Sequence, residues 1–176
     1  RHLERLELQR RNLSPRQTTC VADQPLARLR GGAVQKTYAM LKPDVADDDE
    51  IVARIKAAIA SAGLTIVREE RATLSRDLAA GFYAEHAERD FYDGLLDFMC
   101  SGPILKLALE GDDAIQKWRA LLGPTSTVRA RAEDPDSLRA LFGTDGTANA
   151  AHGSDSPESA ERELQMMFDG DEQATE

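Results

Sequence analysis

The sequence predicts an α+β protein in which a small antiparallel sheet is covered by helices, as in the ferredoxin-like sandwich. Strand signals alternate with helical patterns between residues 36 and 168, and the helical patterns are paired between strands. The 176 residues suffice for one domain with a real core, and a content of 41% hydrophobic and 30% charged residues is typical of a soluble globular protein. The order of the strands does not follow from the pattern.

Residues 1–35 differ in charge from the rest of the chain. They contain seven arginines and three acidic residues, whereas residues 36–176 contain fifteen basic and twenty-eight acidic residues. Prolines and a glycine pair within residues 1–35 prevent one continuous helix. We therefore expect a basic N-terminal arm or linker over residues 1–35, a compact domain over residues 36–168 and an acidic tail over residues 169–176. Because the chain begins at Arg1 and not at Met, we also expect it to be part of a longer protein.

The first half of the compact domain has clear signals. Residues 36–41 predict a strand, which Lys42-Pro43-Asp44 closes as a turn. Acidic residues 47–49 supply capping oxygens and favourable charge at a helix start. Isoleucines spaced by four then define one buried helical face, and Gly63 ends this helix. Residues 64–67 predict a second strand.

The second half is predicted from similar periodicities. Ser75 caps a helix that continues through Tyr83 and Glu85. The remaining expected elements are a helix over residues 90–100, a strand over residues 104–109, a helix over residues 112–122, a polar loop over residues 123–136, a short helical turn over residues 137–142 and a last helix over residues 157–168.

Composition excludes several classes of function. The net charge of −9 makes general nucleic-acid binding unfavourable. No apolar run approaches the roughly 20 residues of a membrane helix, and the start of the chain lacks the pattern of a signal peptide. Cys20 and Cys100 lack metal-ligand spacing and are expected to be free thiols in a reducing compartment. The acidic run at residues 47–50 lacks the alternating ligands of a calcium loop.

A histidine among small residues is the strongest candidate for chemistry. His152 follows Asn149 and two alanines and lies just before a helix start at Ser156. Small neighbours leave room for a ligand at the ring, and a neutral imidazole is a competent nucleophile. Glu163 flanks the apolar face of the last helix, and its half-buried carboxylate would need a donor, which the His152 ring could supply. An ordinary partly buried histidine and a surface acid are the alternatives.

Other residues are weaker candidates when each is taken alone. Lys42 at a strand end can reach phosphates at the edge of a sheet, although its tripeptide is also an ordinary turn. Arg119 and Arg139 are spaced like independent phosphate clamps, although most arginines lie on the surface. Thr125 follows Gly-Pro in a loop that could wrap phosphates. Tyr83 and Phe91 have the alternative of being core residues.

Taken together, the motifs resemble one family, the nucleoside diphosphate kinases, over about residues 35–168. The matching segments, in the order of the family, are Lys42-Pro43-Asp44, Phe82-Tyr83, Phe91 with Gly94-Leu95, Ser101-Gly102-Pro103, Trp118-Arg119, Gly123-Pro124-Thr125, Leu138-Arg139, and the histidine segment with Glu158 and Glu163. A match in many parts is far more specific than any single motif.

The resemblance implies a role for each site residue and a ping-pong reaction through a phosphohistidine. By resemblance, Lys42 contacts the phosphates and the sugar, Tyr83 lies near the terminal phosphate, Phe91 stacks on the base, Arg119, Thr125 and Arg139 bind the phosphates, Asn149 contacts the ribose hydroxyl, His152 is the nucleophile, Ser154 is its neighbour and Glu163 orients it. The implied ligands are nucleoside di- and triphosphates, with Mg²⁺ bound to the nucleotide.

Two departures make the chain resemble a divergent branch of the family. Residues 45–50 are acidic where common members are basic, and the segment from Thr125 to Arg139 is longer than in housekeeping members. This resembles the branch found in cilia and microtubule assemblies, which implies a cytoplasmic, axonemal location. It also leaves an alternative function, a structural or interaction module with weak or no kinase activity. We expect residues 1–35 to bind axonemal or microtubule-associated proteins, with a solvated tail as the alternative, and we expect no housekeeping-type hexamer.

Overall fold

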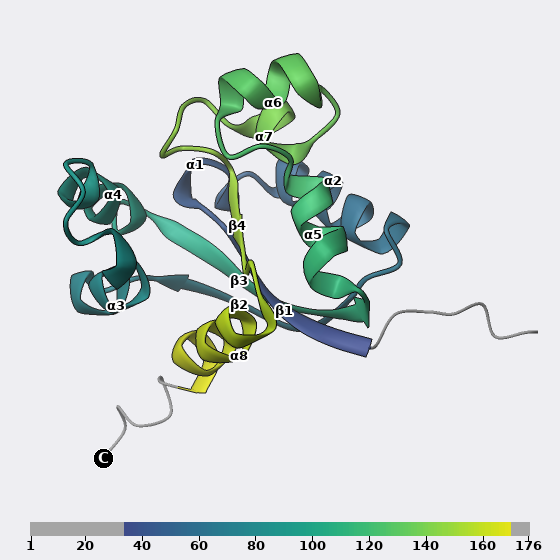
Figure 1. The fold of residues 1–176 in the computed structure, drawn as a ribbon, viewed down its shortest axis with the longest axis horizontal. Coiled ribbons are helices and arrows are strands. Elements are labelled where there is room, and N and C mark those ends of the chain that lie inside the picture. The colour runs from purple at the N-terminus through teal and green to yellow at the C-terminus, as the bar shows by residue number, and fades with distance from the viewer. Residues whose placement is uncertain (1–33, 170–176) are drawn as a thin grey trace, which may run out of the picture. The chain divides into compact units, whose positions relative to one another are not determined.

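A four-stranded antiparallel sheet forms the centre of the protein (Figure 1). The computed structural model describes residues 34–169, so all but the last two residues of the expected arm (residues 1–35) and all but the first residue of the expected tail (residues 169–176) lie outside the described residues. The strands are β1 (Val34–Leu41), β2 (Thr65–Thr73), β3 (Pro103–Asp112) and β4 (Ala151–Gly153). Their order is β2-β3-β1-β4, and β1 pairs antiparallel with both β3 and β4. This order confirms the ferredoxin-like α+β class.

The helices occupy the connections between the strands. These are α1 (Pro43–Ala46) and α2 (Asp49–Ser61) before β2, α3 (Arg76–Phe82), a 3-10 turn (Ala84–His86) and α4 (Tyr92–Met99) before β3, α5 (Ala114–Leu122), α6 (Thr127–Glu133) and α7 (Leu138–Phe142) before β4, and α8 (Pro157–Leu164) with a π-helical turn (Gln165–Asp169) after it. Among the described helices, none is both long and apolar enough to cross a membrane.

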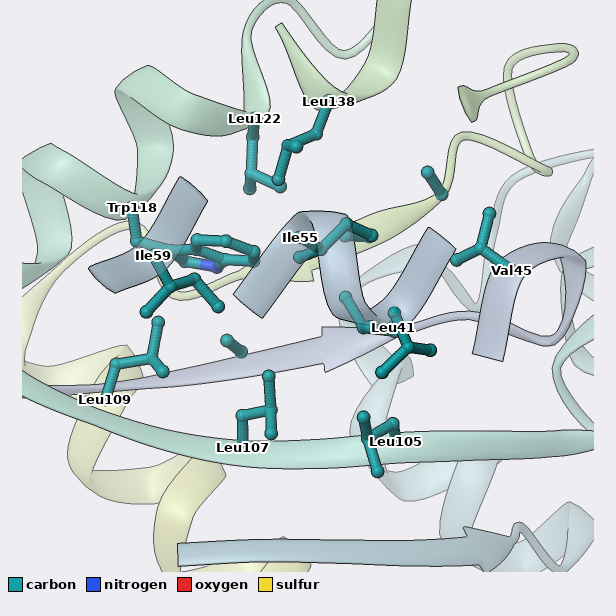
Figure 2. Packing of buried hydrophobic residues seen from close by; sticks show 14 of the residues in the cluster. Leu41, Val45, Ile55, Ile59, Leu105, Leu107, Leu109, Trp118, Leu122 and Leu138 are labelled. Carbon is teal, nitrogen blue, oxygen red and sulfur yellow. The ribbon is translucent and has the colours of Figure 1, made fainter. Parts of the chain in front are cut away.

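The alternation of side chains along β1 and β3 divides the core into two clusters. Residues of one parity, such as Leu105, Leu107 and Leu109, face α2 and α5, as Figure 2 shows around Trp118. Residues of the other parity, such as Tyr38 and Met40, pack against α3, α4 and the end of α8. Because both faces of the central strands are buried, β1 and β3 read as nearly continuous apolar runs rather than as alternating ones.

The prediction of a loop over residues 123–136 is wrong, because α6 lies within it. The Ser126 side chain caps this helix by accepting a hydrogen bond from the Arg129 N–H at 3.4 Å. Arg129 and Glu133 pair one turn apart, at 3.0 Å. Thr127 and Ala130 supply the buried face. Without large apolar residues, the helical period was hidden in the sequence.

Four other expectations needed correction. The turn after β1 is the short helix α1, which starts at Pro43, and β2 continues to Thr73 because an edge strand tolerates polar residues on its exposed positions. The helix expected from residue 112 begins at Ala114, after β3. The last helix becomes π-helical from Gln165. In addition, the segment that contains His152, for which no element was expected, forms the strand β4 by pairing with β1.

Candidate active site

The backbone at His152 is held firmly at the edge of the sheet. His152 lies opposite Met40 in the register between β4 and β1. On its other side, Trp118 Nε1 donates a hydrogen bond to the His152 carbonyl at 3.0 Å. Glycine is required at position 153, because a Cβ there would overlap the Trp118 indole. These contacts place the imidazole in a defined position despite its small neighbours.

The His152 ring is oriented by a buried carboxylate. His152 Nε2 lies 2.9 Å from Glu163 Oε2, and Ser154 Oγ donates to the same oxygen at 2.8 Å. The pairing of His152 with Glu163 expected from the sequence is therefore present. Because an ionised carboxylate only accepts hydrogen bonds, we assign the ring proton to Nε2. Nδ1 then carries the lone pair that can act as a nucleophile.

A cavity of about 550 Å³ lies in front of the histidine. Seven of the predicted site residues line it, namely Lys42, Tyr83, Phe91, Thr125, Arg139, Asn149 and His152. Ser154 and Glu163 lie behind the ring, where both are buried. Arg119 on α5 is exposed and does not line the cavity. The structure thus brings together residues that are spread over more than a hundred positions of the sequence.

Two cations, the buried Lys42 and the half-buried Arg139, give this acidic domain a local positive charge. Burial lowers the pKa of Lys42 from 10.5 to about 8, and its Nζ donates to the Thr147 carbonyl at 2.9 Å. Burial lowers the pKa of Arg139 to about 10, and the nearby charge of Arg119 lowers it further. Arg139 donates to the Gly123 carbonyl at 2.9 Å. Neither cation forms an ion pair with a carboxylate within residues 34–169, so an anionic ligand would be favourable here.

Three buried polar atoms on the cavity residues make no hydrogen bond within residues 34–169. They are Tyr83 Oη, Arg139 Nε and Asn149 Oδ1. Burial raises the pKa of Tyr83, so its hydroxyl stays protonated and can donate. The Asn149 amide nitrogen donates to the carbonyls of Thr125 and Gly146, at 3.3 and 3.0 Å. The remaining donors and acceptors suit a polar ligand, because buried polar atoms are rarely left without partners.

The far side of the cavity is aromatic. Phe91 is 52% exposed, which suits a ring that a flat ligand can cover. His86 stacks on Tyr83 with ring centroids 6.3 Å apart and lies 5.7 Å from Phe91. His86 and Leu95 line the cavity, but neither was predicted as a site residue. His86 follows Tyr83 by three residues, which is about one helical turn, and this spacing could have indicated that His86 lies beside Tyr83 in the site.

The lining contains no set of metal ligands. Within the described part of the chain, no group of three or more His, Cys, Asp or Glu side chains is arranged to hold a metal ion. The lining includes the cationic side chains of Lys42 and Arg139, which would contact phosphate oxygens and not a cation. This donor set fits a metal that arrives bound to a nucleotide, as Mg²⁺ commonly does.

Fold and cavity together define an α+β domain with a cationic cleft facing one oriented histidine. The family model for nucleoside diphosphate kinase matches residues 35–173. A rat protein, nucleoside diphosphate kinase homolog 7, is 47% identical over 147 residues, which cover 83% of this chain and 36% of that protein. A nucleoside diphosphate kinase of Desulfovibrio desulfuricans is 45% identical over 137 residues, which cover 78% of this chain and 96% of that enzyme.

Solved structures agree with the sequence relatives. The nucleoside diphosphate kinase of Aquifex aeolicus matches with a TM-score of 0.73 at 40% identity, covering 77% of this chain and 96% of that one. The Halobacterium salinarum enzyme, solved in complex with CDP, matches with a TM-score of 0.71 at 34% identity, covering 78% and 90%. The chain belongs to the nucleoside diphosphate kinase family. It spans 36% of the length of the rat and mouse relatives.

Proposed function

We propose that this domain transfers the terminal phosphoryl group of a nucleoside triphosphate to a nucleoside diphosphate through phosphorylated His152. The observation that carries the proposal is the contact of 2.9 Å between His152 Nε2 and the buried Glu163 carboxylate. It fixes the tautomer in which Nδ1 is unprotonated, and His152 itself lines the cavity. Membership of the family and the CDP complex of a related structure support the same reaction class.

The reaction balances without a change in the proton on Nε2. Nδ1 attacks the γ-phosphorus, the bond from that phosphorus to the β–γ bridging oxygen breaks, and the diphosphate leaves with the bonding electrons. The terminal oxygen of the second diphosphate then attacks the same phosphorus, and the N–P bond breaks. A covalent intermediate lets one cavity serve both nucleotides in turn. Glu163 stabilises the positive charge that the imidazole gains.

The cavity residues position the nucleotide in this proposal. Lys42 and Arg139 neutralise phosphate charge, Tyr83 donates to the terminal phosphate, and Phe91 stacks on the base without reading its identity. Thr125 and Asn149 hold the phosphates and the ribose. Arg119 lies outside the lining, but its charge acts on Arg139, so it adds to the positive potential at the phosphates. Mg²⁺ bound to the nucleotide would supply further neutralisation of phosphate charge beside that of Lys42 and Arg139.

The test is transfer of labelled phosphate to the protein. The domain is incubated with γ-labelled ATP and Mg²⁺, and the acid-labile, base-stable label expected of a phosphohistidine is measured. We expect about one label per chain, loss of the label in His152→Ala, and release of the label on addition of any nucleoside diphosphate. Label that survives His152→Ala would place the nucleophile elsewhere. An unlabelled native domain would favour the alternative, an interaction module without kinase activity.

The cellular setting is a separate proposal. We propose an axonemal or microtubule-associated location on the likeness to the divergent branch, and binding of such partners by the basic residues 1–35. Removal of residues 1–33, which leaves β1 intact, should then reduce cosedimentation with microtubules, more at low salt than at high salt, without changing phosphohistidine formation. Cosedimentation that persists after this truncation would contradict the partner role of the arm.

A further inference from the structure

Ala150, two residues before the nucleophile, has a strained backbone. Its φ angle is +68°, a value that favours glycine, although Ala150 carries a side chain that is completely buried. The N–H of Ala151 donates to the carbonyl of Asn149 at 2.8 Å, spanning three residues. A hydrogen bond of this span around a positive φ near +75° defines the rarer, strained form of the γ-turn. Such conformations persist only where the surrounding structure imposes them.

The segment that follows β1 imposes this conformation from two directions. Asp44 Oδ2 accepts a hydrogen bond from the Ala150 N–H at 2.9 Å. The backbone N–H of Lys42 donates to the Ala150 carbonyl, also at 2.9 Å. The backbone N–H and the carbonyl of Ala150 are therefore both held by residues that are more than a hundred positions away in the sequence. The Lys42 contact uses only backbone atoms, so Asp44 supplies the side-chain contribution.

Asp44 has no evident role in contacting a ligand. It does not line the cavity, and its second oxygen, Oδ1, is buried without a hydrogen-bond partner among the described residues. Burial raises the pKa of its carboxyl group, and the hydrogen bond from Ala150 opposes this shift. A carboxylate with one oxygen buried and without a hydrogen-bond partner among the described residues is costly. The contact that offsets this cost is the hydrogen bond from the Ala150 N–H to Asp44 Oδ2, which stabilises the turn.

The turn connects directly to the site residues on either side of it. Asn149 before the turn and Ala151 and His152 after it all line the cavity. A relaxed backbone at Ala150 would rotate the peptide that enters β4. The ring of His152 and the amide of Asn149 would then shift relative to each other. Misplacement of a reacting atom by about 1 Å can lower a rate by about 100-fold.

We propose that Asp44 is a positioning residue for the nucleophile: by holding the strained turn at Ala150, it sets the position from which β4 presents His152. This inference rests on the proposed phosphotransfer. The competing explanation is local, because Asp44 also lies in the first turn of α1, where an acidic residue is favourable. A purely local role would affect stability without depending on the conformation of residue 150.

A double-mutant cycle separates the two explanations. Asp44→Ala removes the acceptor, and Ala150→Gly removes the strain, because glycine adopts positive φ without penalty. We expect Asp44→Ala to slow phosphorylation of His152 at saturating ATP by about 10- to 100-fold, while the dissociation constant for ATP changes little. In the Ala150→Gly background, the same substitution should cost several-fold less. An equal loss in both backgrounds, or a loss confined to ATP affinity, would overturn the proposal.

Conservative and matched variants complete the cycle. Asp44→Asn keeps an oxygen that can accept from the Ala150 N–H, so it should retain more activity than Asp44→Ala. If Asp44→Ala does not fold, Asp44→Asn with and without Ala150→Gly replaces it in the same comparison. Asp48→Asn is the control, since Asp48 also accepts backbone hydrogen bonds, from Glu50 and Ile51 at 3.0 Å, but at the start of α2. It should leave the phosphorylation rate unchanged.

A spectroscopic measurement tests the inference even if the native domain transfers no phosphate. Nitrogen chemical shifts of the His152 ring report its tautomer, and the His152→Ala spectrum assigns the signals. In the native protein we expect the Nε2-protonated form alone. Asp44→Ala should produce a mixture of tautomers or broadened signals. Adding Ala150→Gly to Asp44→Ala should restore the single form. A native-like ring spectrum in Asp44→Ala would contradict the positioning role independently of any kinase assay.

Discussion

The two walls of the cavity are built in different ways. On one wall, His152 is held by β4 and by Glu163 of α8, and Glu163 is only 6% exposed. On the other wall, between α3 and α4, Phe91 is 52% exposed. In the first wall, His152 Nε2 and Ser154 Oγ both form hydrogen bonds to Glu163 Oε2. In the second wall, Phe91 is held by contact with the His86 ring. In the proposed reaction, the first wall fixes the position of His152 and the second adapts to the nucleotide.

The supports behind the two walls differ in the same way. The π-helical turn that follows α8 is anchored by two cations from the sheet, since Lys106 donates to the Met167 carbonyl at 2.6 Å and Arg68 donates to the Phe168 carbonyl at 3.1 Å. Lys106 is almost completely buried. In contrast, α3 and α4 are joined at the surface by the exposed side chain of Arg76, which pairs with acidic residues of α4. Exposed pairs of this kind contribute little stability.

Glu163→Gln should give the largest effect, and it tests the wall that holds His152. The amide cannot stabilise the imidazolium that forms, and it can offer a donor to Nε2 in place of an acceptor. A carboxylate that orients a catalytic imidazole can contribute as much as about 10⁴-fold, so we expect at least about a 100-fold fall in kcat. The KM for nucleotide should change far less. Rapid-quench measurement of His152 phosphorylation checks this split, and a change in KM alone would erase the distinction between the walls.

Phe91→Ala should have the next largest effect, and it should change the affinity for nucleotide rather than kcat. Loss of stacking should weaken nucleotide binding by about 1–3 kcal/mol. The loss should be similar for purine and pyrimidine nucleotides, because every base has a π-face. The rate at saturating nucleotide should stay close to that of the native domain. Titration calorimetry with ADP and CDP measures the affinities. A loss seen with only one base would mean that this wall reads base identity.

Raising the pH should weaken nucleotide binding to a smaller extent, through Lys42. Its pKa of about 8 lies below the ordinary value of 10.5, so the positive charge that attracts phosphate is lost as the pH rises through 8. The stability of the unliganded domain should change in the opposite sense. Between pH 8 and 10.5 only the unfolded chain keeps this proton, so unfolding becomes less favourable as the pH rises.

Calorimetry with ADP and thermal melts between pH 7 and 9.5 check both signs. Lys42→Met should bind ADP more weakly at pH 7 and should lose most of the pH dependence. If the native affinity is flat over this range while Lys42→Met remains weak, the free and ADP-bound proteins carry the same number of protons, so the Lys42 amine of the free protein keeps its proton up to pH 9.5 and its pKa is not lowered to about 8.

Arg76→Ala should have the smallest effect. Because its ion pairs with Asp93 and Asp97 are exposed, we expect the dissociation constant for ADP to change by less than about threefold. Titration calorimetry measures it, and Arg129→Ala, which breaks an exposed pair far from α4, is the matched control. If Arg76→Ala weakens ADP binding tenfold and Arg129→Ala does not, the wall between α3 and α4 is more rigid than its exposure indicates.

Much of the fold followed from the sequence, because the signals concerned are local or periodic. Residues 36–41 and 104–109 predicted the central strands, since a strand buried on both faces must be apolar along its length. The isoleucines of α2 predicted its buried face for a similar reason. The pairing of His152 with Glu163 also followed, because a flanking acid on an amphipathic helix needs a donor nearby.

The tertiary structure decided what depends on contacts between distant segments. The turn at Ala150 exists because Asp44 and Lys42 hold it, and no property of alanine announces a positive φ. The short strand at His152 forms only because β1 offers it an edge, and three residues have no strand signal of their own. The place of His86 in the cavity, and the absence of Arg119 from its lining, depend on how helices are set against the sheet. Sequence supplied the chemistry of the side chains, and packing supplied their distances and burial.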